Sequence, residues 1–242
     1  MKPELSVVIP AFNEETRLPT TLGRVKSYLD GQAIPFEVIV VDDGSQDKTL
    51  ALAQQIHSGF RQLRILANVR NRGKGFSVRR GFLEARAALV LVTDADLSAP
   101  IEEYEKLRSA LEGNDGAIGS RALKQSDVYR RQSVFREWSG KIFNQVMRLL
   151  TGLKFQDTQC GFKLFRREPF TPVFAAQRTE GFAFDVEILY LAHKLGLRIV
   201  EVPVRWGNVE GTRVGLIAGL KAFGEIAKIC WIHRGKKRGP LN

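Results

Sequence analysis

The chain has 242 residues, of which 44% are hydrophobic and 26% charged. These fractions are near the averages for soluble globular proteins, and the length suits one α/β domain with a small appended element. Its two cysteines, Cys160 and Cys230, lie far apart and match no metal-ligand spacing. We therefore expect neither a disulfide framework nor a zinc site. We expect the protein to be in a reducing compartment.

A formal net charge of +11 constrains the partners. Such a surface attracts phosphate groups, whether in nucleic acid, lipid headgroups or nucleotides, so charge alone does not choose between them. The first residues show no signal-peptide pattern. No segment approaches the ~18 uninterrupted apolar residues of a membrane-spanning helix. We expect a protein of the cytoplasm or of the cytoplasmic face of a membrane.

The first half of the chain alternates strand-like and helix-like segments. Strands are expected at 5–10, 36–41, 63–67 and 88–93, and helices at 16–29, 50–58 and 76–87. This alternation predicts a mostly parallel sheet with helices on both faces. Ligands bind at the carboxyl ends of the strands in such sheets. Polar residues follow the strands at those ends: Asn13, Glu14, Asp42, Asp43, Arg72, Lys74, Asp94 and Asp96.

The second half is less regular. A short strand is expected at 118–121, a polar arginine-bearing stretch at 122–136, an amphipathic helix at 138–150, a helix at 185–194 and a strand at 198–204. Apolar residues then recur at helical intervals before a basic tail, at Leu216, Leu220, Phe223, Ala227 and Cys230. That pattern is typical of an in-plane membrane helix with a polybasic flank, and equally of an ordinary packed helix.

Asp94 and Asp96 form a D-x-D pattern directly after the fourth strand. Two such carboxylates can hold a divalent cation that also binds a diphosphate. Alone, the pattern is more often a solvated turn. Its place at the end of a buried strand, one loop from basic residues, favours a site for a divalent cation.

Two further loops carry candidate binding residues. Asp42 and Asp43 precede Gly44 and Ser45, where an aspartate can accept hydrogen bonds from a nucleobase or ribose, or can form an Asx turn that caps a helix. Both interpretations stay open. The segment 71–75, NRGKG, is basic and rich in glycine. It has neither P-loop nor G-x-G-x-x-G spacing, which disfavours a dinucleotide-binding dehydrogenase.

Four arginines gather in the middle segment, at Arg121, Arg130, Arg131 and Arg136. Guanidinium groups suit phosphate recognition, and an amphipathic helix follows at once. An exposed basic loop is the alternative. The three histidines, at 57, 193 and 233, show no metal or triad spacing and are expected to be structural or exposed.

Taken in order, these motifs resemble the inverting family 2 glycosyltransferases of the GT-A fold. The matching segments are VVIPAFNEE at 7–15, VDDGSQDKT at 41–49, NRGKG at 71–75 and TDADLSAP at 93–100. Within that family, GSR at 119–121, DTQCGFKLF at 157–165 and FDVEILYLA at 184–192 look like the dolichyl-phosphate β-glucosyltransferase branch. The related mannosyltransferases match the 157–165 segment less closely. The resemblance implies a GT-A domain over 1–213, followed by an amphipathic helix and basic tail over 214–242.

The resemblance also implies roles for individual residues. The nucleotide sugar would be bound by Pro10, Ala11, Phe12, Glu14, Asp42, Lys74, Asp94, Ala95 and Asp96, with Asp42 on the base and Asp94 and Asp96 on Mg²⁺ or Mn²⁺. Arg121, Arg131, Arg136 and Arg213 would hold the acceptor phosphate. Asp157 and Gln159 would lie near the transferred sugar, with Arg121 as a third catalytic candidate.

The function expected from the resemblance is transfer of a hexose, glucose from UDP-glucose, to dolichyl or polyprenyl phosphate at an anionic membrane surface. A GDP-mannose-dependent enzyme and a family 2 transferase with a soluble or glycan acceptor are the enzymatic alternatives. A basic nucleic-acid-binding module is the alternative from another class. No helix-turn-helix, zinc-finger or RNP-like pattern supports it, so no nucleic-acid partner is expected.

Overall fold

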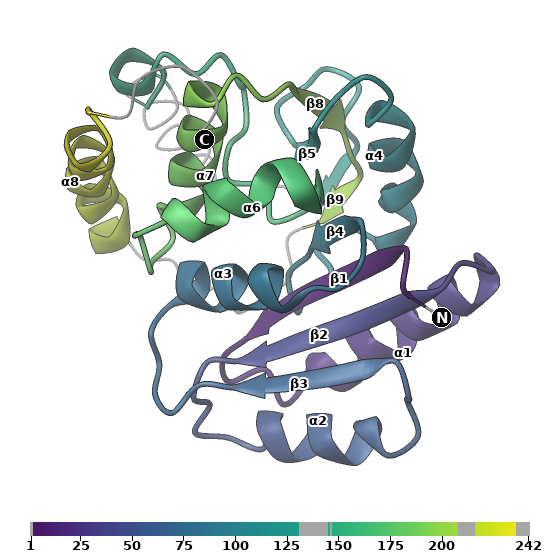
Figure 1. Cartoon of the computed structure of the whole chain (residues 1–242). Helices are drawn as coiled ribbons and strands as arrows, with labels where there is room; N and C mark the ends of the chain where they lie inside the picture. The colour runs from purple at the N-terminus through teal and green to yellow at the C-terminus, as the bar shows by residue number, and fades with distance from the viewer. Residues whose placement is uncertain (1, 131–144, 146, 208–215, 236–242) are drawn as a thin grey trace.

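The structure, a computed structural model, describes residues 2–130, 145, 147–207 and 216–235. Its centre is a seven-stranded sheet of order β3-β2-β1-β4-β7-β5-β8 (Figure 1). The strands are β1 Leu5–Ala11, β2 Phe36–Asp42, β3 Leu63–Ala67, β4 Leu89–Val92, β5 Gly116–Ser120, β7 Lys163–Arg166 and β8 Ile199–Pro203. A separate short pair joins β6 Val128–Arg130 to β9 Trp206–Gly207.

Helices cover both faces of the sheet. They are α1 Leu18–Gly31, α2 Thr49–His57, α3 Lys74–Glu84, the short η1 Ile101–Glu103 and α4 Tyr104–Ala110, α6 Arg167–Ala176, α7 Phe184–Lys194 and α8 Leu216–Ile232. Alternate residues of a strand point to opposite faces, and the core divides accordingly. Val7 of β1 packs with α1, α2 and α4, whereas Val8 packs with α3, α6 and α7.

The predicted mostly parallel sheet is confirmed, with one addition. β7 lies between β4 and β5 and runs antiparallel to both. Its first three residues, 163–165, end the motif DTQCGFKLF, for which no strand is predicted, and the adjoining helix α6 is not predicted either. β1, β2, β3, β4 and β5 still end at the same edge, because β5 is antiparallel to β7 and therefore parallel to β4.

The C-terminal helix is present as α8, but its inner face differs in part from the predicted stripe. Ile226, Ile229 and His233 are buried, whereas Ala227 of the predicted stripe is exposed. The predicted helix at 138–150 is described only near its end, where residues 147–151 are helical. The division at 213 and 214 lies outside the described residues and stays a prediction. Within the part that is described, no helix is long and apolar enough to span a membrane.

Two glycines test how closely the helices pack on the sheet. A Cβ at Gly81 of α3 would lie 2.4 Å from Val8 Cγ1 and 3.0 Å from Val41 Cγ2. Gly81→Ala should therefore destabilise the protein by about 1–3 kcal/mol through overpacking. A Cβ at the exposed Gly23 of α1 would meet nothing within 4 Å. Gly23→Ala should stabilise by about 0.5–1 kcal/mol, since alanine favours the helix.

Urea unfolding of both variants measures the difference. Equal free energies of unfolding for Gly81→Ala and Gly23→Ala would contradict the close packing of α3 against β1 and β2.

Candidate active site

The loops after β1 and β2 are joined by hydrogen bonds at the carboxyl edge of the sheet. Asn13 N–H donates to Ser45 Oγ at 3.0 Å, and Gln46 N–H donates to Asn13 Oδ1 at 2.8 Å. Asn13 has a positive φ of 55°, which costs energy for a residue other than glycine and is typical of functional loops. The two loops therefore form one rigid surface.

The two aspartates after β2 have different environments. The Asp43 carboxylate accepts hydrogen bonds from Asn68 Nδ2 at 2.7 Å and from the backbone N–H groups of Arg72 and Gly73 at 3.1 and 2.7 Å. Asp42 is also buried, but only its Oδ2 has a partner, the Ser45 N–H at 3.2 Å. Its Oδ1 is buried without a hydrogen-bond donor. Asp43 thus fixes the basic loop at residues 71–75. Asp42 retains Oδ1 as a hydrogen-bond acceptor that a ligand could use.

The basic loop between β3 and α3 lies directly against the segment 179–181. A Cβ at Gly73, where φ is 105°, would lie 2.5 Å from Glu180 O, and one at Gly75 would lie 2.6 Å from Thr179 O. Only glycine allows both approaches. Phe76 N–H donates to Glu180 O at 3.2 Å. The position of the loop is fixed by this second segment of backbone.

Lys74 of this loop contacts the D-x-D motif. Its Nζ lies 2.5 Å from Asp94 Oδ1. Burial opposes the charge of Lys74, but the carboxylates of Asp94, Asp185 and Asp96 outweigh burial and raise the pKa of Lys74. On its other side Asp94 packs on Gly161, where a Cβ would lie 2.1 Å from Asp94 Oδ2. Asp94 is thus held between α3 and the loop before β7.

Asp96 is bound less completely than Asp94. Its Oδ1 accepts the Ser98 N–H at 2.9 Å, and its Oδ2 accepts no hydrogen bond from the residues that the structure describes. Leu97, which lies between Asp96 and Ser98, has a positive φ of 47°. No group of three or more His, Cys, Asp or Glu side chains in the described ranges could hold a metal. Two carboxylates fit a Mg²⁺ or Mn²⁺ ion whose remaining ligands are phosphate oxygens and water.

Arg121, directly after β5, and Asp157, in the loop before β7, form a close ion pair. Arg121 Nε and Nη2 donate to the two oxygens of Asp157 at 2.6 and 2.8 Å, and the Arg121 backbone N–H adds a third bond at 3.0 Å. The guanidinium also lies 5.3 Å from the centre of the Trp206 ring. Gln159 N–H donates to Asp157 Oδ1 at 3.0 Å, while its buried Nε2 has no acceptor.

This pair fixes the charge of both partners. Burial opposes ionisation of Asp157, but the charge and hydrogen bonds of Arg121 outweigh it and lower the pKa of Asp157. Burial likewise opposes the charge of Arg121, and Asp157, with a contribution from Asp94, raises its pKa. Asp157 is therefore an ionised partner of Arg121 near neutral pH and is poorly suited to accept a proton there.

A buried ion pair between Lys163 and Asp185 was not predicted from the sequence. Lys163 Nζ donates to Asp185 Oδ1 at 2.6 Å and to the carbonyl of Cys160. Both side chains are buried. Burial, together with Asp94, raises the pKa of Asp185 against the opposing effect of Lys163 and Lys74. Lys163 and Asp185 are 22 residues apart in the sequence, so no local sequence pattern predicts that they form a pair.

The remaining predicted residues divide into two groups. Pro10 and Ala11 end β1, and Phe12 and Glu14 follow in the joined loop, with Glu14 bound by Arg17 Nε at 2.6 Å. Ala95 is buried, and its carbonyl accepts the Thr21 hydroxyl at 2.6 Å. Arg131, Arg136 and Arg213 lie outside the described residues, so their predicted roles stay predictions.

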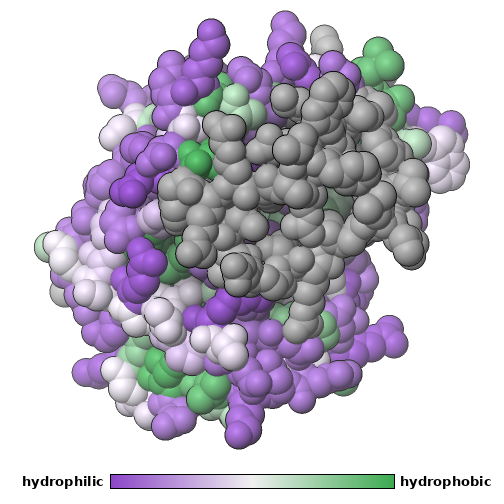
Figure 2. Space-filling view, turned by 180° about the vertical axis from the view of Figure 1, so that it is seen from behind, coloured by the Kyte–Doolittle hydropathy of each residue, from purple (hydrophilic) through white to green (hydrophobic). Residues whose placement is uncertain are grey.

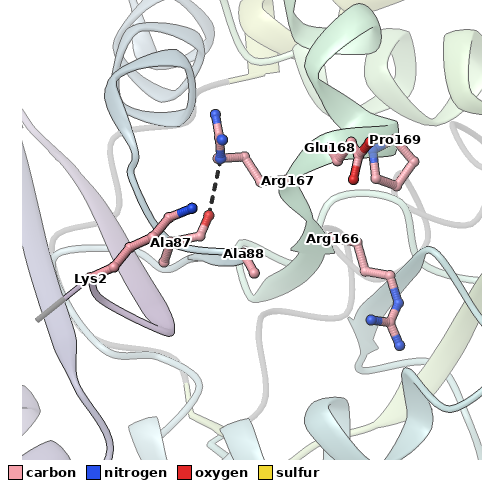
Figure 3. Close-up of a pocket in the computed structure, with 7 residues that line it drawn as sticks. All are labelled: Lys2, Ala87, Ala88, Arg166, Arg167, Glu168 and Pro169. Atoms are coloured by element: carbon pink, nitrogen blue, oxygen red, sulfur yellow. Dashed lines mark hydrogen bonds between the residues drawn. The ribbon is translucent and has the colours of Figure 1, made fainter.

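A pocket of about 250 Å³ lies elsewhere, next to the start of β4 (Figure 3). It is lined by Lys2, Ala87, Ala88, Arg166, Arg167, Glu168 and Pro169. Arg167 Nε donates to Ala87 O at 3.1 Å. Ala87 and Ala88 precede β4 and the D-x-D motif follows it, so this pocket and the candidate site are at opposite ends of that strand.

With this geometry in view, similarity to known proteins decides the family. Residues 6–174 match the family model described as glycosyl transferase family 2. The chain belongs to glycosyl transferase family 2. It is 41% identical to a dolichyl-phosphate β-glucosyltransferase of Drosophila melanogaster, over 95% of this chain and 75% of the relative. The human enzyme of that name is 38% identical, over 87% of this chain and 69% of the relative. The Saccharomyces cerevisiae enzyme is 35% identical, over 88% and 69%.

Solved structures of glucosyl-3-phosphoglycerate synthase from Mycobacterium tuberculosis share the fold. A complex with phosphoglyceric acid superposes with a TM-score of 0.70 at 21% identity, over 95% of this chain and 80% of that one. A complex with Mn²⁺, UDP and glucosyl-3-phosphoglycerate gives a TM-score of 0.67 at 23% identity, over 99% and 81%. The predicted GT-A fold, the predicted enzyme class and the stated resemblance are confirmed.

The Arg121–Asp157 pair predicts a pH-dependent loss of stability. Asp157→Asn should cost about 3 kcal/mol at pH 7, because it leaves the partly buried Arg121 without its counter-charge. The folded-state pKa of Asp157 is lowered, so its contribution is present above the unfolded-state pKa and disappears as pH falls through the folded value. The gap between wild type and variant should therefore narrow below about pH 4.

Urea unfolding at pH 7 and pH 3 measures this gap. The matched control is Asp127→Asn, which breaks the exposed Arg205–Asp127 pair at 3.4 Å and should cost less than about 1 kcal/mol. A cost for Asp157→Asn that is equally small, or independent of pH, would contradict the assignment.

Proposed function

We propose that this glycosyltransferase moves glucose from UDP-glucose to a dolichyl or other polyprenyl phosphate, with inversion at the anomeric carbon. The observation that carries the proposal is the guanidinium of Arg121, fixed by Asp157 and electrostatically linked to Asp94. A cation that is electrostatically coupled to Asp94 would bind a phosphate close to the D-x-D motif. The names of the relatives at 35–41% identity, dolichyl-phosphate β-glucosyltransferases, support this choice of substrates.

The donor would lie across the joined loops. Asp42 Oδ1, buried and without a donor of its own, would accept a hydrogen bond from the base. Asp96, supported by Asp94, would hold Mg²⁺ or Mn²⁺, which neutralises charge that develops on the departing diphosphate when it is bound. Lys74 would add a fixed positive charge at the same place. UDP is favoured because the structural relatives of similar fold were solved with it.

The acceptor would need positioning more than activation. A phosphate monoester has a second pKa of about 6 and is ionised at neutral pH, so it can attack the anomeric carbon without a strong base. Asp157 agrees with this, because its lowered pKa and its three bonds to Arg121 suit a positioning residue. Arg121 would bind the acceptor phosphate through Nη1, which lies outside the pair, and Arg131, Arg136 and Arg213 are proposed to help. Gln159 Nε2 is a further donor for sugar or phosphate.

A peripheral membrane contact would bring the lipid acceptor to this site. Leu149, Leu150 and Trp231 are 85%, 46% and 62% exposed, and Cys230 Sγ lies 3.5 Å from Leu150 O, which places the two segments side by side. Figure 2 shows hydrophobic residues at the upper right, on this side of the molecule. Exposed Arg148 and Arg234 add positive charge. An anionic bilayer surface at the cytoplasmic face matches both features.

The decisive experiment is a transfer assay with labelled UDP-glucose and GDP-mannose, each offered polyprenyl phosphate in the presence of Mn²⁺ or EDTA. Label should enter the lipid from UDP-glucose only, and EDTA should prevent it. Asp96→Asn should reduce transfer at least about a hundredfold with the melting temperature unchanged. Asp30→Asn, in an exposed pair with Lys26, is the matched control.

Each other outcome has a definite meaning. Label from GDP-mannose would replace glucose by mannose. Label in a soluble product alone would remove the lipid acceptor. Full activity of Asp96→Asn would overturn the metal assignment.

The membrane contact makes a separate prediction. Leu149→Asp combined with Trp231→Asp should weaken co-sedimentation with phosphatidylglycerol vesicles at least tenfold, because burial of one such side chain contributes about 1.5–3 kcal/mol. Val69→Asp alters an equally exposed residue in the loop after β3 and should leave vesicle binding unchanged. Equal binding by the double variant and wild type would place the membrane contact elsewhere.

A further inference from the structure

Glu187 of α7 is a fully buried carboxylate that the proposed chemistry does not use. Its Oε1 accepts hydrogen bonds from the Arg178 N–H at 2.9 Å and from His233 Nε2 at 2.6 Å. Its Oε2 accepts the Thr179 N–H at 2.7 Å. One side chain therefore binds two consecutive backbone amides and an imidazole, and it fixes the segment that begins at Arg178.

That segment is the surface on which the basic loop rests. Gln177 Nε2 donates to both Gly75 O and Thr179 O at 2.9 Å and so joins the loop to the segment. Phe76 N–H donates to Glu180 O. The missing side chain of Gly75 leaves room for Thr179 O. A shift of residues 178–180 would therefore move the loop.

The loop in turn sets the position of Lys74. Lys74 is the first residue of α3, and its Nζ reaches Asp94 Oδ1 at 2.5 Å. A small displacement at the start of α3 would lengthen this contact and move a positive charge away from the proposed diphosphate. Coulombic attraction falls with distance, so donor binding should respond.

The other partner of Glu187 comes from the end of the chain. His233 follows α8, is buried, and its carbonyl accepts Lys194 Nζ at 2.5 Å. Ile226 of α8 belongs to the same apolar core as Phe184 and Leu189 of α7, and Ile229 is also buried. The imidazole of His233 thus connects the end of α8 to Glu187 through a hydrogen bond.

We propose that Glu187 and His233 are positioning residues for the donor site. They hold the backbone at 178–179, which fixes the loop that carries Lys74, and they link donor binding to the docking of α8. The inference rests on the proposed function for its donor, a nucleoside diphosphate sugar. It assigns no catalytic role to either side chain, since neither reaches the site directly.

The test is the Kd of UDP with Mn²⁺, measured by calorimetry on the full chain, beside donor and acceptor KM. Glu187→Gln keeps the shape but replaces one acceptor oxygen by a donor, and should raise the Kd and the donor KM about tenfold, equivalent to ~1.4 kcal/mol. His233→Leu should raise both in the same direction. Acceptor KM should stay within twofold of wild type for both variants.

Two further variants separate positioning from stability. His233→Gln retains an N–H donor of similar reach and should restore the wild-type Kd. Val25→Ala removes buried methyl groups from α1, which packs on the other face of the sheet, and should lower the melting temperature while the Kd of UDP is unchanged. Lower melting temperatures with a wild-type Kd for Glu187→Gln and His233→Leu would overturn the proposal, as would failure of His233→Gln to restore binding.

Gln177→Met covers the case in which Glu187→Gln does not fold. It removes the bonds from Gln177 to Gly75 and Thr179 and leaves the Glu187–His233 pair intact, so the Kd of UDP should again rise, and a wild-type Kd would overturn the inference. Wild-type protein that binds UDP but does not glucosylate polyprenyl phosphate would disprove the proposed acceptor and leave this test in force. Wild-type protein that binds no UDP would overturn both proposals.

Discussion

Carboxylates at the carboxyl edge of the sheet must be ionised to bind a metal or an arginine, yet several lie where water hardly reaches. A buried charge is tolerated only when it is paired and hydrogen-bonded. Lys163–Asp185 is a fully buried pair, the buried Asp157 is paired with Arg121, and the partly exposed Asp94 is paired with Lys74. Each pair joins segments distant in sequence. The same pairing that compensates these charges therefore also joins the segments that form the site.

The two neighbouring aspartates of each motif, Asp42 and Asp43 in one and Asp94 and Asp96 in the other, have different hydrogen-bond environments. Asp43 is saturated by a side-chain amide and two backbone N–H groups, whereas Asp42 has a buried oxygen without a donor. Asp94 is held by Lys74, whereas Asp96 keeps its Oδ2 outside any hydrogen bond to the described residues. In both motifs one carboxylate builds the loop and the other is left for a ligand. The sequence pattern alone does not distinguish them.

The sequence predicts the strands better than it predicts the contacts between loops. β1, β2 and β3 are runs rich in Val, Ile and Leu that begin where expected. β1 and β2 are buried on both faces and therefore show no alternation of apolar and polar residues. β7 was not predicted because Lys163 interrupts the apolar pattern of the strand. The ammonium group of Lys163 can be buried because it is paired with the carboxylate of Asp185. The Asp157–Arg121 pair spans 36 residues and the Glu187–His233 pair spans 46. Such contacts depend on the tertiary fold and leave no trace in local spacing.

The helix at the end of the chain shows how one segment can serve two environments. Ile226 and Ile229 are buried in the core of the glycosyltransferase domain, and His233 joins Glu187. Trp231, between them in sequence, is 62% exposed, because residues two apart on a helix point to different sides. The inner face is thus already occupied by protein, and only the outer face is available to lipid. A helix held in this way can lie against a membrane without leaving the domain, so the proposed contact with lipid and the proposed donor loop would belong to one rigid unit.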